Sequence, residues 1–498
     1  MGGVSPRRPL SVLLAACVLV GTVTGCENSV ESGSMSLAPT RTATSSSSAP
    51  APPPQKLVLA VDKPRQSPGV VVAGGADAPY NYAPSVLREG GRIRAWWCSQ
   101  LGSAQPGGDD ILYSEGPTLD AAFSAAAPVF SGSHSGFDAM HVCDPSVIHV
   151  GGTYYMYYTA ASRDNHANGS AVGVATSPDG VVWTRANNGQ PIIVPSNDVL
   201  RENTYGAGQQ SAVHVDGWFY LMFTDTTGRG AQPNGAGQFV LRSRDPLFGK
   251  GVQALGDGGM APVASTNRPR ARSVVEAFSA DWMWIDAVSA FAIAHETDAG
   301  TTVTFWDKDF TRHPFDPVLI PGVWREGPGL VRTAEGHAPI DPADPCGRVS
   351  LDVLRATAIG AAGAPTDIRH FGLDAVGLRG CATTAEVGAL NGYTVPSPEN
   401  TADVVVGDKV VRFERRSVAV KFSRGVLAER PAVVDSLPVA VRVPAGAQAV
   451  RAPDGEVGLV LDDKLWIVDS AEVAALNSSP VKDVTAGQWA RYERGRFS

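Results

Sequence analysis

The sequence predicts an all-β fold: a five-bladed β-propeller followed by a small C-terminal β-rich module. Three observations predict it. A unit of short strands joined by a tight glycine turn recurs along the middle of the chain. The units start about 45 to 70 residues apart, a spacing typical of propeller blades. Gly (54) and Pro (37) are frequent, which favours many tight turns over long helices.

The repeated unit is clearest in three places, and each copy has a short strand, a glycine turn and an aromatic strand. These copies cover residues 83–98, 144–159 and 209–224, and each then meets a third strand. Weaker copies begin at Asp281 and Glu326. A β-sandwich is the alternative, but it needs no repeated unit with one type of turn. We therefore assign residues 57–385 to the propeller.

The first residues have the pattern of an export signal. Arg7 and Arg8 precede an apolar stretch that ends in Val-Thr-Gly-Cys26, which resembles the lipobox of bacterial lipoproteins. Residues 1–25 are thus predicted to be a lipoprotein signal peptide, and 26–56 a Ser/Pro-rich tether. The alternative is an ordinary signal peptide with an incidental cysteine. We expect lipidation at Cys26 and an extracytoplasmic, lipid-anchored protein at the bacterial cell membrane.

Four cysteines remain beyond the signal and the anchor. In an oxidising compartment they are expected to form two disulfides, which we pair by neighbourhood as Cys98 with Cys143 and Cys346 with Cys381. No CxxC pair and no His/Asp/Glu spacing indicates a metal site, so we predict neither a metal nor a cofactor.

The charge balance bears on the class of partner. The formal net charge is −8 and no basic run stands out, which argues against a nucleic-acid partner. An uncharged ligand fits this composition better than a polyanion. We expect a monomer that binds an oligo- or polysaccharide.

Three segments carry a family resemblance. They read CDPSVIHVGGTYYMYYTA, GQQSAVHVDGWFYLMFTD and REGPGLV. They resemble inner strands of five-bladed propeller glycoside hydrolases of the family 43 type, the clan of arabinanases, β-xylosidases and arabinofuranosidases. The resemblance covers about residues 75–380. It implies hydrolysis of glycans that contain arabinose or xylose, by carboxylate acid/base catalysis.

Glycoside hydrolysis needs two carboxyl groups that converge at one mouth of the channel, where the inner strands begin. Asp144, before Pro145, matches the position of the family's general base, although an Asp before Pro often only caps a turn. Glu326, in Glu-Gly-Pro, matches the general acid, and partial desolvation would raise its pKa. Asp281 is the candidate for a third carboxylate that tunes the acid. The alternative for Glu326 is a glutamate exposed in a Gly-Pro turn without a catalytic role. The alternative for Asp281 is an aspartate that only begins a strand beside core tryptophans.

The sequence also departs from the family pattern. The first copy begins Tyr82-Ala83-Pro84, without an acid, and the third begins with two amides. The second interpretation is therefore a non-catalytic glycan-binding or scaffold propeller on the cell surface. The candidate substrate-binding residues under either interpretation are Asn81, His166, Gln209, Gln210 and Trp282, the last as a sugar-stacking platform. Asp109 and Asp110 are expected in a surface turn.

The C-terminal region changes in character. Residues 396–400 have the composition of a linker, and strands are expected within 404–422, 439–443 and 465–468. Residues 400–498 are therefore predicted to form a small β-rich module, either a structural cap or a partner-binding domain.

Overall fold

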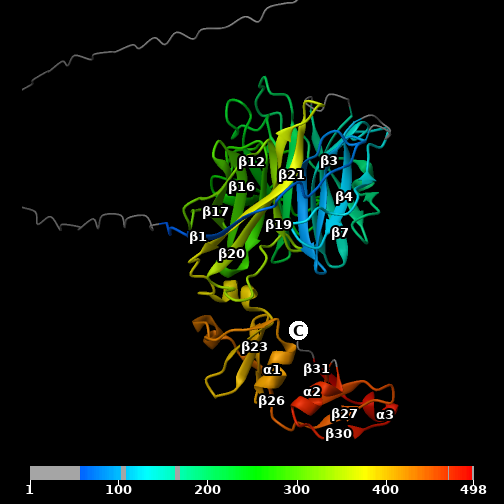
Figure 1. The fold of residues 1–498 in the computed structure, drawn as a ribbon, viewed down its shortest axis with the longest axis vertical. Helices are drawn as coiled ribbons and strands as arrows, with labels where there is room; N and C mark the ends of the chain where they lie inside the picture. The colour runs from blue at the N-terminus through cyan, green and yellow to red at the C-terminus, as the bar shows by residue number, and fades with distance from the viewer. Residues whose placement is uncertain (1–55, 102–107, 163–168, 469, 496–498) are drawn as a thin grey trace, which may run out of the picture. The chain divides into compact units, whose positions relative to one another are not determined.

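The structure is a computed structural model that describes residues 56–101, 108–162, 169–468 and 470–495 (Figure 1). Within these residues, no helix is long and apolar enough to cross a membrane. The predictions for the signal peptide, the tether, Cys26 and His166 fall on residues outside the described part of the chain.

The described residues up to Val376 form sheets in which all strand pairs but β19 with β2 are antiparallel, so the prediction of a mostly-β chain of several sheets is confirmed. Two sheets have four strands, one has five, and one has eight because β19 pairs with β2. The strands are β1 (Ala60–Gln66), β2 (Tyr82–Glu89), β3 (Arg92–Ser99), β4 (Asp110–Gly116), β5 (Ala127–Phe130), β6 (His141–Val150), β7 (Thr153–Ala161), β8 (Ala171–Ser177), β9 (Thr184–Arg185), β10 (Ala207–Val215), β11 (Trp218–Asp225), β12 (Gln238–Ser243), β13 (Gln253–Gly256), β14 (Gly259–Pro262), β15 (Ala280–Ile285), β16 (Ala290–Thr297), β17 (Gly300–Asp307), β18 (Val318–Pro321), β19 (Glu326–Arg332), β20 (Arg348–Ile359) and β21 (Pro365–Val376).

The first strands of successive groups lie against one another. β2 contacts β6, β6 contacts β10, β10 contacts β15, and β15 contacts β19. The series closes because β19 pairs in parallel with β2, while β1 pairs antiparallel with β21 and adds an N-terminal strand to the last group. These first strands therefore surround one central channel.

Apolar side chains fill the space between each neighbouring pair of groups. The aromatic strands β3, β7 and β11 are almost wholly buried because both of their faces meet protein. Trp96, for example, packs with Val147 and Met156 of the next group, while Trp97 packs with Val331 and Leu354 of the last one. Burial on both faces explains why these strands appear in the sequence as continuous apolar runs.

Both predicted disulfides are confirmed. Cys98–Cys143 joins β3 to β6 across two neighbouring groups, with the Cα atoms 5.1 Å apart. Cys346–Cys381 joins the residues that flank the β20–β21 hairpin, with the Cα atoms 5.4 Å apart. The first bond lies directly beside Asp144, so it also holds a candidate site residue in place.

The C-terminal region holds two small sheets of the same topology. Each has three antiparallel strands, a helix, a strand parallel to the first, a second helix, and a strand parallel to the third. The first copy is β22 (Tyr393–Pro396), β23 (Ala402–Val406), β24 (Lys409–Phe413), α1 (Arg416–Phe422), β25 (Gly425–Val426), η4 (Ala432–Ser436) and β26 (Val439–Val443). The second copy is β27 (Ala449–Arg451), β28 (Val457–Leu461), β29 (Lys464–Val468), α2 (Ala471–Leu476), β30 (Val481–Asp483), α3 (Ala486–Trp489) and β31 (Glu493–Gly495).

Two expectations for this region need correction. Residues 397–401 form the turn between β22 and β23 rather than a linker, since β22 already begins at Tyr393. The strand expected over 404–422 ends at Phe413, and Val418 lies on helix α1, where it and Ala419 are buried.

Candidate active site

The first strands of four groups share a local distortion. The pairing register of β2, β6, β10 and β19 shifts near the start of each strand, as at a β-bulge. At the shift, three residues that are not glycine take positive φ angles: Ala83 (48°), Asp144 (47°) and Gln209 (48°). Such backbone costs of order 1–3 kcal/mol per residue and recurs at ligand sites, because a bulge redirects a side chain out of the regular pleat. The strand β15, which carries Asp281, has no such shift.

Asp144 is held in this conformation from several directions. The side-chain amide of Gln210 donates to its backbone carbonyl, and the Tyr205 hydroxyl donates to its Oδ2 at 3.2 Å. The disulfide fixes the preceding residue, Cys143. Asp144 is 9% exposed, so its carboxylate is nearly enclosed.

Glu326 begins β19 and keeps part of its surface exposed. Burial by the surrounding protein, followed by the charges of Asp144 and then Glu296, raises the pKa of Glu326 to about 7. A backbone hydrogen bond at Gly327 opposes this rise. The structure thus places Asp144 near enough to Glu326 for its charge to raise the pKa of Glu326. Their positions at the starts of two inner strands predict this proximity. Of the two residues, Asp144 is the more buried.

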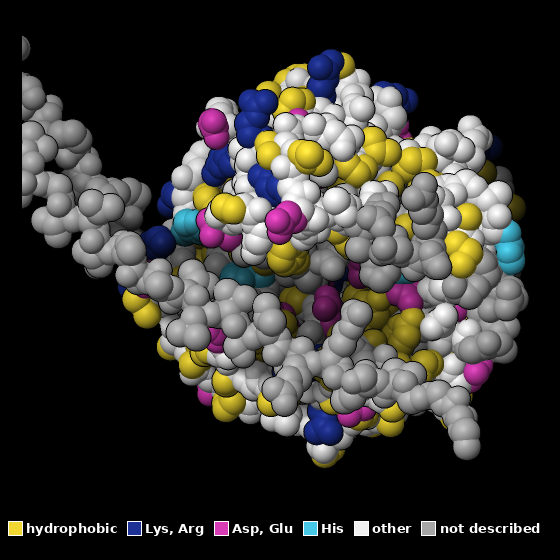
Figure 2. All heavy atoms as spheres, turned by 90° about the horizontal axis from the view of Figure 1, so that it is seen from above, with side chains coloured by type: hydrophobic (Ala, Val, Ile, Leu, Met, Phe, Trp, Pro, Cys, Tyr) yellow, Lys and Arg dark blue, Asp and Glu magenta, His cyan; other side chains and the backbone are white. Residues whose placement is uncertain are grey.

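Both carboxyl groups line one cavity of about 360 Å³. A volume of this size falls at the lower end of the range for small-molecule sites. Figure 2 shows acidic side chains inside a hollow on the face viewed. The described side chains of the lining include no lysine or arginine; they are those of Tyr80, Tyr82, Asp109, His141, Cys143, Asp144, Tyr205, Gln209, Glu326, Ala364 and Pro365.

The expectation that Asp109 and Asp110 lie in a surface turn is wrong, because both residues are buried. The Asp109 carboxylate accepts hydrogen bonds from the hydroxyls of Tyr80 and Tyr82, and His141 Nδ1 lies 3.2 Å from its Oδ2. Burial acts to raise the pKa of Asp109, but the hydrogen bond and charge of His141, with the two tyrosine hydroxyls, outweigh burial and lower it. No sequence motif joins these residues, and only the fold brings them together.

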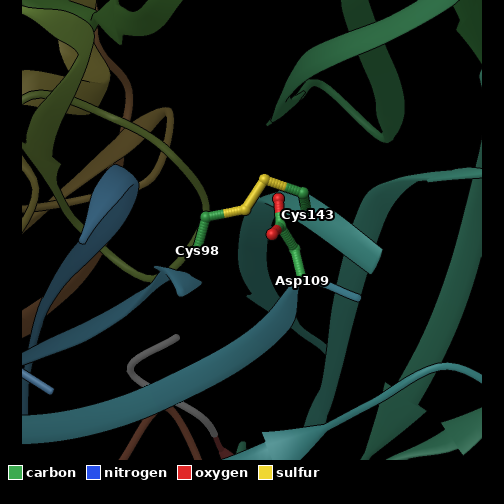
Figure 3. A group of neighbouring side chains, drawn as sticks. All are labelled: Cys98, Asp109 and Cys143. Atoms are coloured by element: carbon green, nitrogen blue, oxygen red, sulfur yellow. A yellow bond between two sulfur atoms is a disulfide. The ribbon is translucent and has the colours of Figure 1, made fainter. Parts of the chain in front are cut away.

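Asp109 also lies against the Cys98–Cys143 disulfide, as Figure 3 shows. An aspartate and two cysteine sulfurs so close together could suggest a metal centre. Both sulfurs are committed to the disulfide, however, so neither is a thiolate ligand. This group is therefore structural in the oxidised protein.

Asp281 does not line this cavity but lies in the central channel, whose lining shares Asp144 and Gln209 with the cavity. Its Oδ2 accepts the Leu330 amide at 2.7 Å, and its Oδ1 accepts the Ser211 hydroxyl and lies 3.2 Å from Arg332 Nη1. Arg332 is fully buried in the channel. Asp281 is not among the groups that shift the pKa of Glu326. Its contacts join the neighbouring first strands of the channel, and a role in tuning the acid stays a prediction.

Three residues predicted to contact the ligand are instead buried and make their contacts inside the protein. Trp282 is 0% exposed and packs against Phe291, so it offers no face to a sugar. Asn81 is buried and its Oδ1 accepts from Trp97 Nε1 at 2.7 Å. Gln210 uses both ends of its amide inside the protein: Oε1 accepts from the Thr159 hydroxyl, and Nε2 donates to Asp144 and Tyr157.

Gln209 differs from Gln210. It lines both the cavity and the central channel, and its Oε1 is buried without a hydrogen-bond partner among the described residues. A buried polar atom without a partner is costly, and a ligand hydroxyl at this point would satisfy it. Gln209 therefore stays a predicted ligand contact.

Comparison with known proteins gives only distant likenesses. No family model matches the chain, and no curated protein matches it. Among solved structures, it is similar to a family 117 glycoside hydrolase of the marine bacterium Zobellia galactanivorans, with 14% identity, a TM-score of 0.43, and coverage of 64% of this chain and 91% of the other. It is also similar to the catalytic domain of a family 62 α-L-arabinofuranosidase of Coprinopsis cinerea, with 12% identity, a TM-score of 0.40, and coverage of 64% and 97%. Such low scores assign neither a family nor an activity to this chain.

Proposed function

We propose that this protein is a glycoside hydrolase whose site opens on one mouth of a five-bladed β-propeller. The observation that carries the proposal is the pair of carboxyl groups in one cavity, of which Glu326 has a pKa of about 7. A carboxyl group with such a pKa is still largely protonated in mildly acidic solution and can donate a proton. The closed series of first strands supports the blade count.

In the proposed reaction, Glu326 donates a proton to the glycosidic oxygen as the bond to the anomeric carbon breaks. Asp144 supplies the second carboxylate on the opposite side, where it activates water or attacks the anomeric carbon itself. Their mutual repulsion keeps one of the two protonated, since two like charges in a poorly solvated cavity do not both ionise easily. The Tyr205 hydroxyl, which donates to Asp144 Oδ2, keeps the Asp144 carboxylate in position.

The proposed substrate is a neutral glycan that contains arabinose or xylose. The cavity lining supports a neutral sugar, because it combines acidic groups and tyrosine hydroxyls with no lysine or arginine among its described members. The Gln209 Oε1, which has no hydrogen-bond partner among the described residues, can accept a hydrogen bond from a sugar hydroxyl. A panel of aryl-pentosides and arabinan or xylan oligosaccharides would test turnover. Binding without turnover would favour the alternative, a non-catalytic glycan-binding propeller.

The pH profile provides a sharper test of the acid. Turnover should fall as the pH rises through about 7, because Glu326 then loses the proton that it must donate. Glu296 carries the smaller of the two charges that raise this pKa, and burial raises the pKa of Glu296 itself to about 7, so Glu296→Gln should move the alkaline limb to lower pH by a small amount. The matched control is Glu276→Gln, an exposed glutamate whose replacement should leave the profile unchanged. An alkaline limb that stays in place when Glu326 itself is replaced with glutamine would contradict the assignment of Glu326 as the acid.

We also propose that the protein is exported and anchored to the cell membrane through a lipid on Cys26. The Val-Thr-Gly-Cys sequence and the Ser/Pro-rich segment after it support this. The Cys26→Ala variant should leave the membrane fraction or accumulate unprocessed, as measured by fractionation and metabolic lipid labelling. Lipid labelling equal to that of the unaltered protein would rule the anchor out.

A further inference from the structure

The two C-terminal copies match residue by residue at a constant offset. The hairpin Ala402–Phe413 and the hairpin Val457–Val468 have the same pairing register, Ala402 with Phe413 and Val457 with Val468. The buried helix residues Val418 and Ala419 correspond at the same spacing to Val473 and Ala474. Figure 1 shows the elements of the first copy in orange and those of the second in red. The region is thus a tandem repeat, and each position in one copy has a counterpart in the other.

One face of this repeat is used differently in the two copies. In the first copy, Val433, Val434 and Leu437 are buried in an apolar cluster that includes Leu390 and Val349, and Leu427 packs against it. The counterparts of Leu427, Val433 and Leu437 in the second copy are Lys482, Gln488 and Tyr492. The first copy therefore buries this face inside the protein, whereas the second copy presents polar side chains there.

These polar side chains line a hollow of about 260 Å³ in the second copy. Its lining holds two cations, two amides and one phenol: Lys482, Arg491, Gln448, Gln488 and Tyr492, beside Val484. Among the described residues, none forms an ion pair with Lys482 or Arg491, and none of those that line the hollow carries a carboxylate. Two other cations of this copy differ, since Arg451 is paired with Asp483 and Lys464 with Glu493, whereas Arg494 lies over the ring of Trp489.

This combination has a definite chemical preference. A guanidinium group can bind a carboxylate or phosphate through two parallel hydrogen bonds, and a neighbouring ammonium adds a point charge. The Gln448 amide can both donate and accept, as recognition of sugar hydroxyls requires. The Gln488 Oε1 already accepts from the backbone amide and the hydroxyl of Thr485, so Gln488 offers only its amide donors. The ring of Tyr492 offers an apolar surface with a polar tip. The lining thus suits a ligand that carries an acidic group among hydroxyl groups.

We infer that the second C-terminal copy is a binding module for an acidic saccharide, held at the hollow between Gln448, Lys482 and Arg491. The choice of a saccharide among anions rests on the proposed function, because a module that holds one part of a mixed glycan would keep the neutral part near the hydrolase site. The anionic character rests on the hollow alone. The proposed subsite therefore differs in charge preference from the cavity of Asp144 and Glu326.

The test measures equilibrium binding to the full chain, so that it does not depend on turnover. Trigalacturonate is titrated calorimetrically beside neutral arabinotriose, a tri-glutamate peptide and inorganic phosphate. The variants install the first copy's residues: Lys482→Leu, as at Leu427, and Arg491→Ser, as at Ser436. Each should weaken trigalacturonate binding by about tenfold, and the pair by about a hundredfold, because each removes a charge-assisted contact. The control Lys464→Leu should bind as the unaltered chain does, and unchanged melting temperatures should show that all variants fold.

Several outcomes would overturn the inference. Equal affinity for trigalacturonate and arabinotriose would remove the anionic preference. Undiminished binding by the double variant would place the ligand elsewhere. Tighter binding of the tri-glutamate peptide or of inorganic phosphate would exclude a saccharide as the specific ligand. If the chain fails to hydrolyse any glycan but the variants still lose trigalacturonate binding, the proposed hydrolase function fails while the binding module stands.

Discussion

Replacing Glu326 with glutamine should lower turnover by about 10²–10⁴-fold and leave the fold intact. Glutamine has nearly the same size as glutamate but cannot donate a proton to the leaving oxygen. It also removes the group with a pKa near 7, so any residual activity should lose the alkaline limb of its pH profile. The measurement is kcat and kcat/KM across pH, with circular dichroism and melting temperature to compare the folds.

Asp144→Asn is the companion variant, and it should lower turnover by a similar factor. It also removes the larger of the two charges that raise the pKa of Glu326, so a direct titration of Glu326 by NMR should give a lower pKa. Glu276→Gln serves again as the control for an exposed carboxyl group. A Glu326→Gln enzyme with a normal rate would rule out this pair of residues and leave the glycan-binding interpretation ahead.

The largest effect on stability is expected from Asp281→Ala. This change leaves Arg332, which is fully buried, without its carboxylate partner, and it leaves the Leu330 amide without its acceptor. Breaking a buried pair from one side costs about 3–5 kcal/mol, because an uncompensated charge stays inside the protein. Denaturant unfolding monitored by tryptophan fluorescence measures the loss.

The control is Asp257→Ala, which removes an exposed carboxylate in the turn between β13 and β14. Its free energy of unfolding should change by no more than about 0.5 kcal/mol. Asp281→Asn separates the two roles considered for this residue. If Asp281 tuned the acid, Asp281→Asn would shift the alkaline limb of the pH profile. If it supports the channel, stability should fall and the limb should stay in place.

Much of the strand pattern could be predicted from the sequence, because strands buried on both faces leave continuous apolar and aromatic runs. Pairing the four cysteines by neighbourhood was also correct. The rule that inner strands begin at one mouth of the channel brought Asp144 and Glu326 to one cavity. Asp281 does not line that cavity: its strand, β15, lacks the bulge found in β6 and β19, and its carboxylate lies against Arg332.

The rest of the site depends on contacts that no local pattern records. Asp109 meets His141 and two tyrosines only after two sheets pack together. The C-terminal repeat did leave a signal, since ADVVVGDKVVRF and VGLVLDDKLWIV share a strand-turn-strand pattern around an acidic turn. That signal is weak because β-branched alternation is common to most strands.

The pairing of β1 with β21 has a consequence for how the chain folds. Ala60 meets Val376, so the first described strand has no partner until almost the whole of the ring has been synthesised. Contacts between residues so distant in sequence are slow to form, because a long loop must close before they stabilise anything. Between the synthesis of β21 and its pairing with β1, the outer edge of β21 is unpaired, and an unpaired strand edge can pair with another chain. Ring closure is thus expected to be the last step of folding, and its delay sets how long the newly made protein is exposed to aggregation.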